Sequence, residues 1–220
     1  MTLALDLTER DAAGDTERVL VLLPGFGDEP ATFADHLDVV DPDRRWHVAI
    51  ARPPVATPEG PAWFTVDADG PDSEQLAASV LALAATLADL LDRFGLEPDA
   101  LVLGGFSQGG AMALATALDP TVTARPGAVA SLAAYLPHRE ADQDPTQLAG
   151  RPVLVAHGAD DEVVDALLGR SAAKALHRAG AVVTWSEVDT GHAVAGPLAD
   201  VLSRWLSAVA DGAVPSAPPT

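Results

Sequence analysis

The sequence contains no cysteine and a single lysine, Lys174. Without cysteine the chain forms no disulfide, no thiolate zinc site and no cysteine nucleophile. Basic residues are scarce altogether, since 13 lysines and arginines face 32 aspartates and glutamates, which gives a formal net charge of -19. Such an acidic surface repels phosphate backbones and anionic lipid, so we expect neither nucleic acid nor a membrane as a partner. We attribute the acidity to solubility rather than to an acidic binding role.

The sequence also lacks a long uncharged apolar segment of about 18 residues, which argues against a membrane span. Residues 1–6 have no basic stretch followed by a long apolar run, so they do not resemble a signal peptide and we expect a cytoplasmic location. With 220 residues and 48% hydrophobic content, the chain can bury one sizeable core, and residues 1–209 are predicted to form one domain. Residues 210–220, rich in proline, alanine and serine, are predicted to be a disordered tail.

Apolar runs alternate with amphipathic helical patterns along the rest of the chain. About five successive units of this kind indicate an α/β fold with a mainly parallel, doubly wound sheet and helices on both faces. The predicted strands are residues 19–23, 46–51, 101–103, 129–132, 152–156 and 182–188, with a candidate edge strand at 3–7. The predicted helices are residues 30–40, 73–94, 108–118, 163–179 and 197–209, and Ser73 is the predicted cap of the second. The segment 52–70 is broken by prolines and is predicted to be a loop.

The most informative stretch is residues 101–114, where an apolar run meets a glycine-flanked serine and passes into an alanine-rich helical pattern. Residues 105–109, Gly-Phe-Ser-Gln-Gly, fit the nucleophile elbow, in which small neighbours let the backbone fold back without a Cβ collision. The letters alone are a weak signal, and the flanking strand and helix make it specific. Ser107 is therefore a predicted nucleophile, the alternative being an incidental serine in a glycine-rich turn.

A serine nucleophile needs a base, and the base must be oriented by a third group. Ser107, Asp161 and His192 each follow a predicted strand end, where ligands bind in such sheets, and their order is that of an α/β-hydrolase triad. Residue chemistry does not separate Asp161 from Asp160.

Other residues compete for the roles of acid and base. Asp189 is a third candidate for the acid. His157 competes with His192 for the base, and its alternative role is a turn residue hydrogen-bonded to the backbone. The remaining histidines, at 36, 47, 138 and 177, lie in helical patterns or lack a glycine-rich setting.

An oxyanion needs two backbone donors, and the N–H of Gln108, directly after the nucleophile, is one candidate. Phe26, in the glycine-rich loop 24–28, is the best-placed second donor, the alternative being a plain glycine turn. Within the loop 52–70, Trp63 and Phe64 either cover the core or wall an acyl or alcohol pocket. No histidine pair has the helical spacing of a zinc protease, so we expect neither a metal nor another cofactor.

With these motifs in hand, the sequence resembles the phospholipase/carboxylesterase family of α/β-hydrolases, which includes bacterial carboxylesterases and acyl-protein thioesterases. The resemblance covers residues 19–206, and Gly-Phe-Ser-Gln-Gly-Gly at 105–110 is its most specific part. It implies an α/β-hydrolase fold with Ser107 as nucleophile, Asp161 rather than Asp160 as acid, and His192 as base. It also assigns Phe26 and Gln108 to the oxyanion hole. Trp63 and Phe64 resemble the aromatic pair that follows the family's lid-like loop.

The sequence departs from the family pattern at three places, of which the third bears on the substrate. Pro24 replaces a histidine, Asp165 stands where a proline is common, and the segment 53–62 looks shorter, which implies an open and shallow acyl site. We therefore expect a cofactor-independent serine carboxylesterase that cleaves short- to medium-chain esters through an acyl-enzyme. The alternatives are a thioesterase, acyl-protein thioesterase or lysophospholipase on the same triad, and a non-catalytic scaffold that binds a small ligand. The expected partner is a small-molecule ester, and a homodimer is left open.

Overall fold

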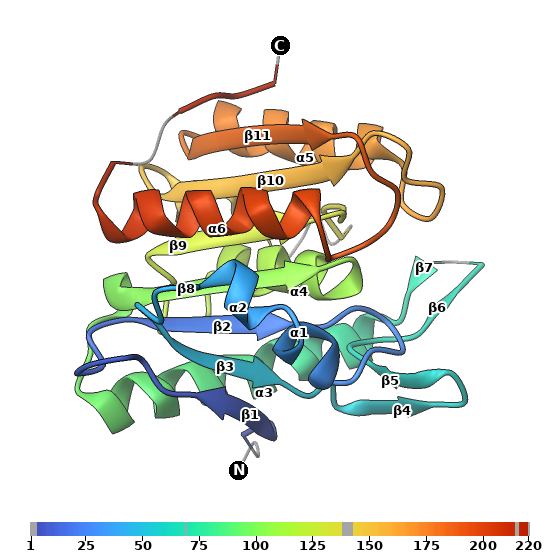
Figure 1. The fold of residues 1–220 in the computed structure, drawn as a ribbon. Helices are drawn as coiled ribbons and strands as arrows, with labels where there is room; N and C mark the ends of the chain where they lie inside the picture. Colours follow the sequence, from blue (N-terminus) through green and yellow to red (C-terminus); the bar gives the residue numbers. More distant parts are fainter. Residues whose placement is uncertain (1–3, 69, 138–142, 214–215, 220) are drawn as a thin grey trace.

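The computed structural model describes residues 4–68, 70–137, 143–213 and 216–219. Its centre is a seven-stranded sheet in the order β1-β3-β2-β8-β9-β10-β11, in which β1 alone runs antiparallel to its neighbour (Figure 1). The strands are β1 (Leu7–Arg10), β2 (Val19–Leu23), β3 (His47–Ala51), β8 (Leu101–Phe106), β9 (Ala128–Leu132), β10 (Pro152–Gly158) and β11 (Val182–Val188). The predicted fold class, a mainly parallel α/β sheet, is confirmed.

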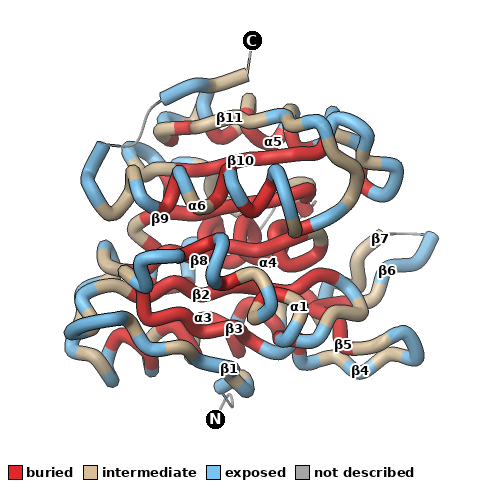
Figure 2. The backbone as a smooth tube through the Cα atoms, viewed as in Figure 1, coloured by how far each residue is buried: buried red, intermediate tan, exposed pale blue. Residues whose placement is uncertain are grey.

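Helices cover both faces of the sheet, which is why the central strands are continuously apolar. Every residue of β2, β3, β8 and β9 is buried (Figure 2). On one face lie α3 (Ser73–Phe94), α4 (Gln108–Leu118) and α5 (Ala166–Arg178), and on the other α1 (Ala31–Ala34), α2 (Leu37–Val40) and α6 (Pro197–Ala210). Side chains of alternate strand residues fill the two cores. The carboxyl ends of the parallel strands therefore share one edge, at the right of Figure 1.

Several predicted elements differ from the structure, and the helix predicted at 30–40 is two short helices, α1 and α2. The loop 52–70 carries two small hairpins, β4 (Val55–Thr57) with β5 (Gly60–Ala62) and β6 (Val66–Asp67) with β7 (Gly70–Pro71). The first turn closes because the hydroxyl of Thr57 donates to the carbonyl of Gly60, a residue at φ +122°. The long helix α3 is capped by Asp72, whose side chain accepts from two backbone N–H groups, and not by Ser73. The edge strand comprises residues 7–10 rather than 3–7.

The C-terminal segment was predicted to be a disordered tail from residue 210. Ala210 is the last residue of α6, and Ala217 forms a bridge to Thr184 of the edge strand β11. The N–H of Ala217 donates to Val183 and its carbonyl accepts from Trp185, at 2.8 Å each. This part of the segment is therefore paired with the sheet, whereas residues 214, 215 and 220 lie outside the described part of the chain.

One helix among the described residues, α3, is long and apolar enough to cross a membrane by length and composition alone. Of its most apolar 18-residue window, 44% is buried inside the protein. Its buried side chains belong to the core on the face of the sheet that α4 and α5 also cover. The apolar character of α3 is thus used in packing against the sheet.

Candidate active site

The serine elbow lies between the end of β8 and the start of α4. Ser107 has φ +54° and ψ -121°, a strained conformation for a residue with a side chain. A Cβ on Gly105 would collide with the backbone of Gly109, and a Cβ on Gly109 would collide with the carbonyl of Leu23 in β2. The N–H of Ser107 donates to Leu132 at the end of β9, at 2.8 Å. Three neighbouring strands therefore hold the serine at the carboxyl edge of the sheet.

The structure brings Ser107, His192 and Asp161 together from three separate strand ends. Nε2 of His192 lies 3.0 Å from Oγ of Ser107, and Nδ1 lies 2.8 Å from Oδ2 of Asp161. A carboxylate only accepts, so Nδ1 carries the ring proton and Nε2 is free to accept one. The imidazole packs against the ring of Phe106 with centroids 4.7 Å apart, which fixes its plane. The arrangement can therefore pass a proton from the hydroxyl to the ring.

The Asp161 carboxylate is fully buried, with 0% of its side chain exposed. Oδ1 accepts the backbone N–H groups of Val163 and Val164, at 2.9 and 2.8 Å. Burial alone would raise the pKa of this carboxyl, but the hydrogen bonds from His192, Val164 and Val163 together hold the pKa of Asp161 below its ordinary value. The group is thus ionised at neutral pH, and it can orient the imidazole and stabilise its charged form.

The competing candidates lie elsewhere. Asp160 and Asp189 are exposed, and neither bonds the His192 ring. His157 is fully buried within β10 and not in a turn, and its Nε2 donates to the backbone carbonyl of Val164 at 2.8 Å. Of the other histidines, His47 bonds Glu9 at the far end of the sheet. Residue 138 lies outside the described residues.

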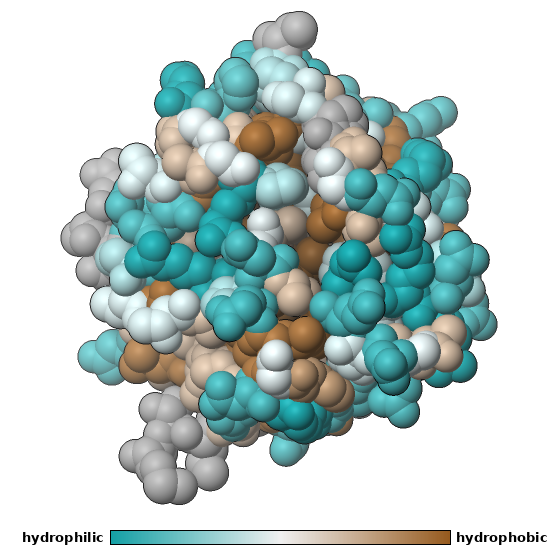
Figure 3. All heavy atoms as spheres, turned by 90° about the vertical axis from the view of Figure 1, so that its left-hand side faces the viewer, coloured by the Kyte–Doolittle hydropathy of each residue, from teal (hydrophilic) through white to brown (hydrophobic). Residues whose placement is uncertain are grey.

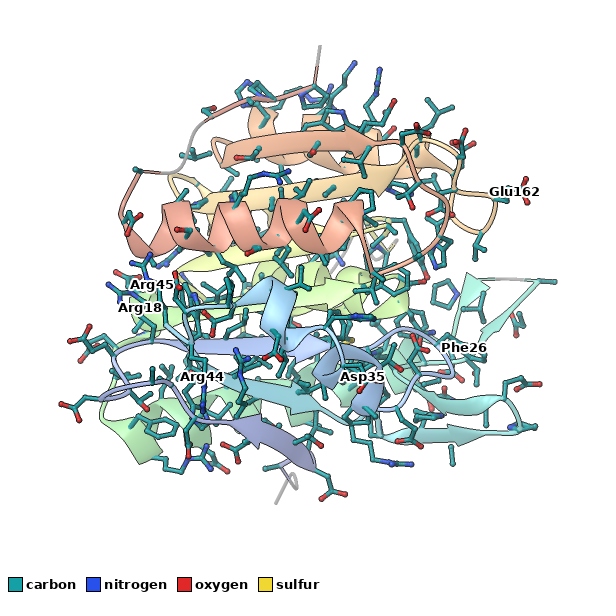
Figure 4. The ribbon with its side chains drawn as sticks, viewed as in Figure 1. Arg18, Phe26, Asp35, Arg44, Arg45 and Glu162 are labelled. Carbon is teal, nitrogen blue, oxygen red and sulfur yellow. The ribbon has the colours of Figure 1, made fainter. Side chains whose placement is uncertain are left out.

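The glycine-rich loop after β2 lies against the elbow. A Cβ on Gly25 would be 3.4 Å from Cβ of Ser107, so the chain passes close to the nucleophile. The loop is held from the hairpin side, where the N–H of Gly27 donates to Pro61 at 2.8 Å. The N–H groups of Phe26 and Gln108 have no hydrogen-bond partner among the residues that the structure describes. Figure 4 shows Phe26 at the edge where the strands end.

Trp63 and Phe64 are not exposed to a pocket, which corrects the interpretation that they wall the substrate. Both side chains are 0% exposed and belong to the core. The indole N–H of Trp63 donates to the carbonyl of Pro24 at 2.9 Å. The amide side chain of Gln108 accepts from the N–H of Trp63 and donates to the carbonyl of Phe64. The aromatic pair therefore joins the hairpin segment to the loop after β2 and to the start of α4.

Sequence reasoning missed a carboxyl group beside the histidine. Asp28 is half-buried in the loop after β2, close enough to His192 for their charges to interact. Burial raises the pKa of Asp28, against the opposing effects of a hydrogen bond from Gly25, the charge of His192 and a hydrogen bond from Thr32. The sequence signal that could have found Asp28 was its position in the glycine-rich loop 24–28.

An apolar cavity of about 370 Å³ at the same edge of the sheet was also missed, because its lining comes from three separate segments. It is lined by Pro71, Tyr135, Leu136, Leu168, Ser171 and Ala172. Ala134, which precedes Tyr135, faces Gly110 in the first turn of α4, so the cavity lies next to the elbow. Leu168 is one of the exposed large apolar side chains of the protein.

Charge is distributed unevenly around this edge. Glu162 lies beside the strand ends together with Phe26, whereas Arg18, Arg44 and Arg45 lie at the opposite end of the sheet (Figure 4). That opposite end, which faces the viewer in Figure 3, presents hydrophilic residues interspersed with apolar ones. The acidic residues that follow strands ending at this edge include Asp28 after β2, Asp160, Glu162 and Asp165 after β10, and Asp189 after β11, while Arg52 follows β3. An anionic group that approaches the serine would therefore meet like charge.

Comparisons with known proteins identify the family of the chain and support its fold. The family model described as phospholipase/carboxylesterase matches residues 10–208. Esterase YpfH of Escherichia coli is 29% identical over 186 residues, 81% of this chain and 77% of that protein. Acyl-protein thioesterase 1 of Gibberella zeae is 37% identical over 95 residues, 41% of this chain, and the match spans only 40% of that protein. A solved carboxylesterase from Mesorhizobium loti superposes with a TM-score of 0.80 at 25% identity, over 93% of this chain and 95% of that one.

Proposed function

The chain belongs to the phospholipase/carboxylesterase family, and from that premise we propose that it is a serine carboxylesterase that cleaves short- to medium-chain esters through an acyl-enzyme. One observation carries the proposal: a continuous hydrogen-bonded path runs from Oγ of Ser107 through His192 to the buried carboxylate of Asp161. Each group along the path has the protonation that its role requires, since the Asp161 carboxylate is ionised and Nε2 of His192 is free to accept a proton.

In the proposed acylation, Oγ of Ser107 bonds to the ester carbonyl carbon while its proton moves to Nε2 of His192. The resulting oxyanion would be held by the N–H groups of Phe26 and Gln108, which have no other partner in the described part of the chain. The C–O bond to the alcohol then breaks, and the alcohol leaves with the proton from His192. A water deprotonated by His192 attacks the acyl-enzyme and releases the acid, which restores Ser107.

The apolar cavity beside the elbow supports an acyl group of modest length as the part of the substrate that is bound. The acidic surroundings of the site disfavour an anionic leaving group such as a lysophospholipid head group, so neutral esters are the proposed class. The fungal thioesterase relative favours thioesters as a second candidate. Matched ester and thioester substrates with one acyl chain distinguish the two, because a carboxylesterase retains the higher kcat/KM on the ester.

A series of p-nitrophenyl acetate, butyrate, hexanoate and octanoate tests the proposed acyl site. We expect kcat/KM to rise by about threefold per added methylene until the cavity is filled, from the transfer free energy of a buried CH₂. Ser171→Phe, a change at an exposed lining residue, is expected to lower hexanoate hydrolysis about tenfold relative to acetate. Ser207→Phe, in a depression at the opposite end of the sheet, is the control. An unchanged chain-length preference in Ser171→Phe would contradict this assignment of the acyl site.

Hydrolysis is expected to fall on acidification towards pH 5, because an imidazolium at position 192 cannot accept the Ser107 proton. Asp161 does not cause this loss, since the pKa of its carboxyl is lowered and the group is still ionised there. The lowered pKa of Asp161 in the folded protein instead contributes to the free energy of unfolding at neutral pH. This contribution is lost when the carboxyl is protonated, below about pH 4.

The pH dependence is measured as kcat/KM between pH 5 and 9, each sample being returned to pH 8 to show that the loss on acidification is reversible. A flat profile down to pH 5 would speak against His192 as the base.

A further inference from the structure

His157 is fully buried beside Asp161 and takes no part in the acyl-transfer steps described above. It is the residue before the last in β10, and its side chain lies on the face that α5 covers, as the alternation with Val153 and Val155 requires. Nε2 lies 2.8 Å from the carbonyl of Val164 and 3.3 Å from Oδ2 of Asp161. The carbonyl only accepts, so Nε2 carries a proton, and the positive end of this N–H lies beside the oxygen that holds His192.

The other side of the His157 ring is confined by α5. A Cβ on Gly169 would lie 2.5 Å from Nδ1, so the imidazole fits there because the helix carries a glycine. Nδ1 has no hydrogen-bond partner among the described residues, and the bond from Nε2 to Val164 holds the ring. Packing against α5 and one hydrogen bond to the carbonyl of Val164 thus give His157 a single orientation.

We propose that His157 is a positioning residue for the hydrolysis, an inference that rests on the proposed function. Rotation of a carboxylate about its last bond is broad and roughly two-fold, so a triad acid needs support on both oxygens. The N–H groups of Val163 and Val164 hold Oδ1 of Asp161, and the N–H of His157 lies against Oδ2. By bonding the carbonyl of Val164, His157 also ties β10 to the loop that carries the acid.

A pair of amide substitutions tests the proposal. In His157→Gln the side-chain NH₂ reaches the position of the imidazole Nε2, whereas in His157→Asn it stops near the position of Nδ1 and cannot contact Val164 or Asp161. Rates are taken per active site titrated with a fluorophosphonate, so that unfolded molecules are not counted. We expect kcat to fall about tenfold in His157→Asn, with KM within about twofold, from the loss of one long contact to a charged group. His157→Gln should keep kcat within about threefold.

Three results would overturn the proposal: an unchanged kcat per titrated site in His157→Asn, an equal loss in the Asn and Gln variants, or a change confined to KM. A merely structural role lowers the number of titratable sites and not the rate of each one. If His157→Asn does not fold, Gly169→Ala, which crowds Nδ1 from the helix side, must lower kcat per titrated site in the same way. His177→Asn, at an exposed histidine of the same helix, is the control. Failure of the wild type to hydrolyse any ester would instead refute the proposed function.

Discussion

Substitution of Ser107 by alanine is expected to lower kcat for a p-nitrophenyl ester by about a millionfold, the size of loss seen when a serine nucleophile is removed. The reason is that the covalent step disappears, while the candidate oxyanion donors and the fold remain. Alanine has the same Cβ and therefore tolerates φ +54° as serine does, so thermal stability should change little. The measurement is ester hydrolysis under saturating substrate, with labelling by a fluorophosphonate as an independent readout of the nucleophile.

The matched control for this variant is Ser207→Ala, a serine-to-alanine change on α6 at the opposite end of the sheet. It should leave both hydrolysis and labelling unchanged. Full activity in Ser107→Ala would show that another group carries the reaction. Labelling of Ser107→Ala at the wild-type rate would lead to the same conclusion, because the probe reacts with an activated serine.

Asp161→Asn is expected to lower kcat by about ten-thousandfold while leaving the site's geometry in place, as an acid-to-amide change in a serine triad does. The amide oxygen can still accept the N–H groups of Val163 and Val164. Its NH₂ group, placed where Oδ2 was, donates to Nδ1 of His192 and forces the ring proton onto Nε2. His192 then presents a proton to Ser107 and cannot remove one.

Asp160→Asn is the natural control for this change, because residue 160 is adjacent, exposed and of the same chemistry. We expect its kcat to stay within about twofold of the wild type, as for a surface substitution away from the reacting groups. A large loss in Asp160→Asn together with a small loss in Asp161→Asn would transfer the role of the acid to the neighbouring residue. Both variants are compared with the wild type at the same pH, pH 8.

The strands, the helices and the elbow could be read from the sequence because their causes are local. The run Val19–Leu23 is buried on both faces and keeps its predicted bounds. The glycines at 105 and 109 allow the serine turn whatever the rest of the chain does. The cap of α3, Asp72, was not predicted because Asp72 and Ser73 are both good capping residues. The choice between them depends on where the first helical residue lies.

The role of the aromatic pair could not be read in this way. A Trp-Phe pair in a proline-rich loop suits a pocket wall and a core equally well, because both remove aromatic surface from water. The pair is held in the core by Gln108, which lies 45 residues away from Trp63 in the sequence and accepts its backbone N–H. The same holds for His157, whose nearness to Asp161 and to Gly169 depends on how β10 packs against α5.

The sequence by itself determined the fold class, the elbow and the order of Ser107, Asp161 and His192 along the chain, because hydrophobic periodicity and glycine sterics act over a few neighbouring residues. Only the tertiary structure decided which aspartate meets His192, where Trp63 and Phe64 lie, and that a second imidazole and a second carboxyl stand beside the site. The physical reason is distance along the chain. The hydrogen bonds that join the three residues span 85 and 31 positions, and such contacts follow from sheet order and helix packing rather than from any local pattern.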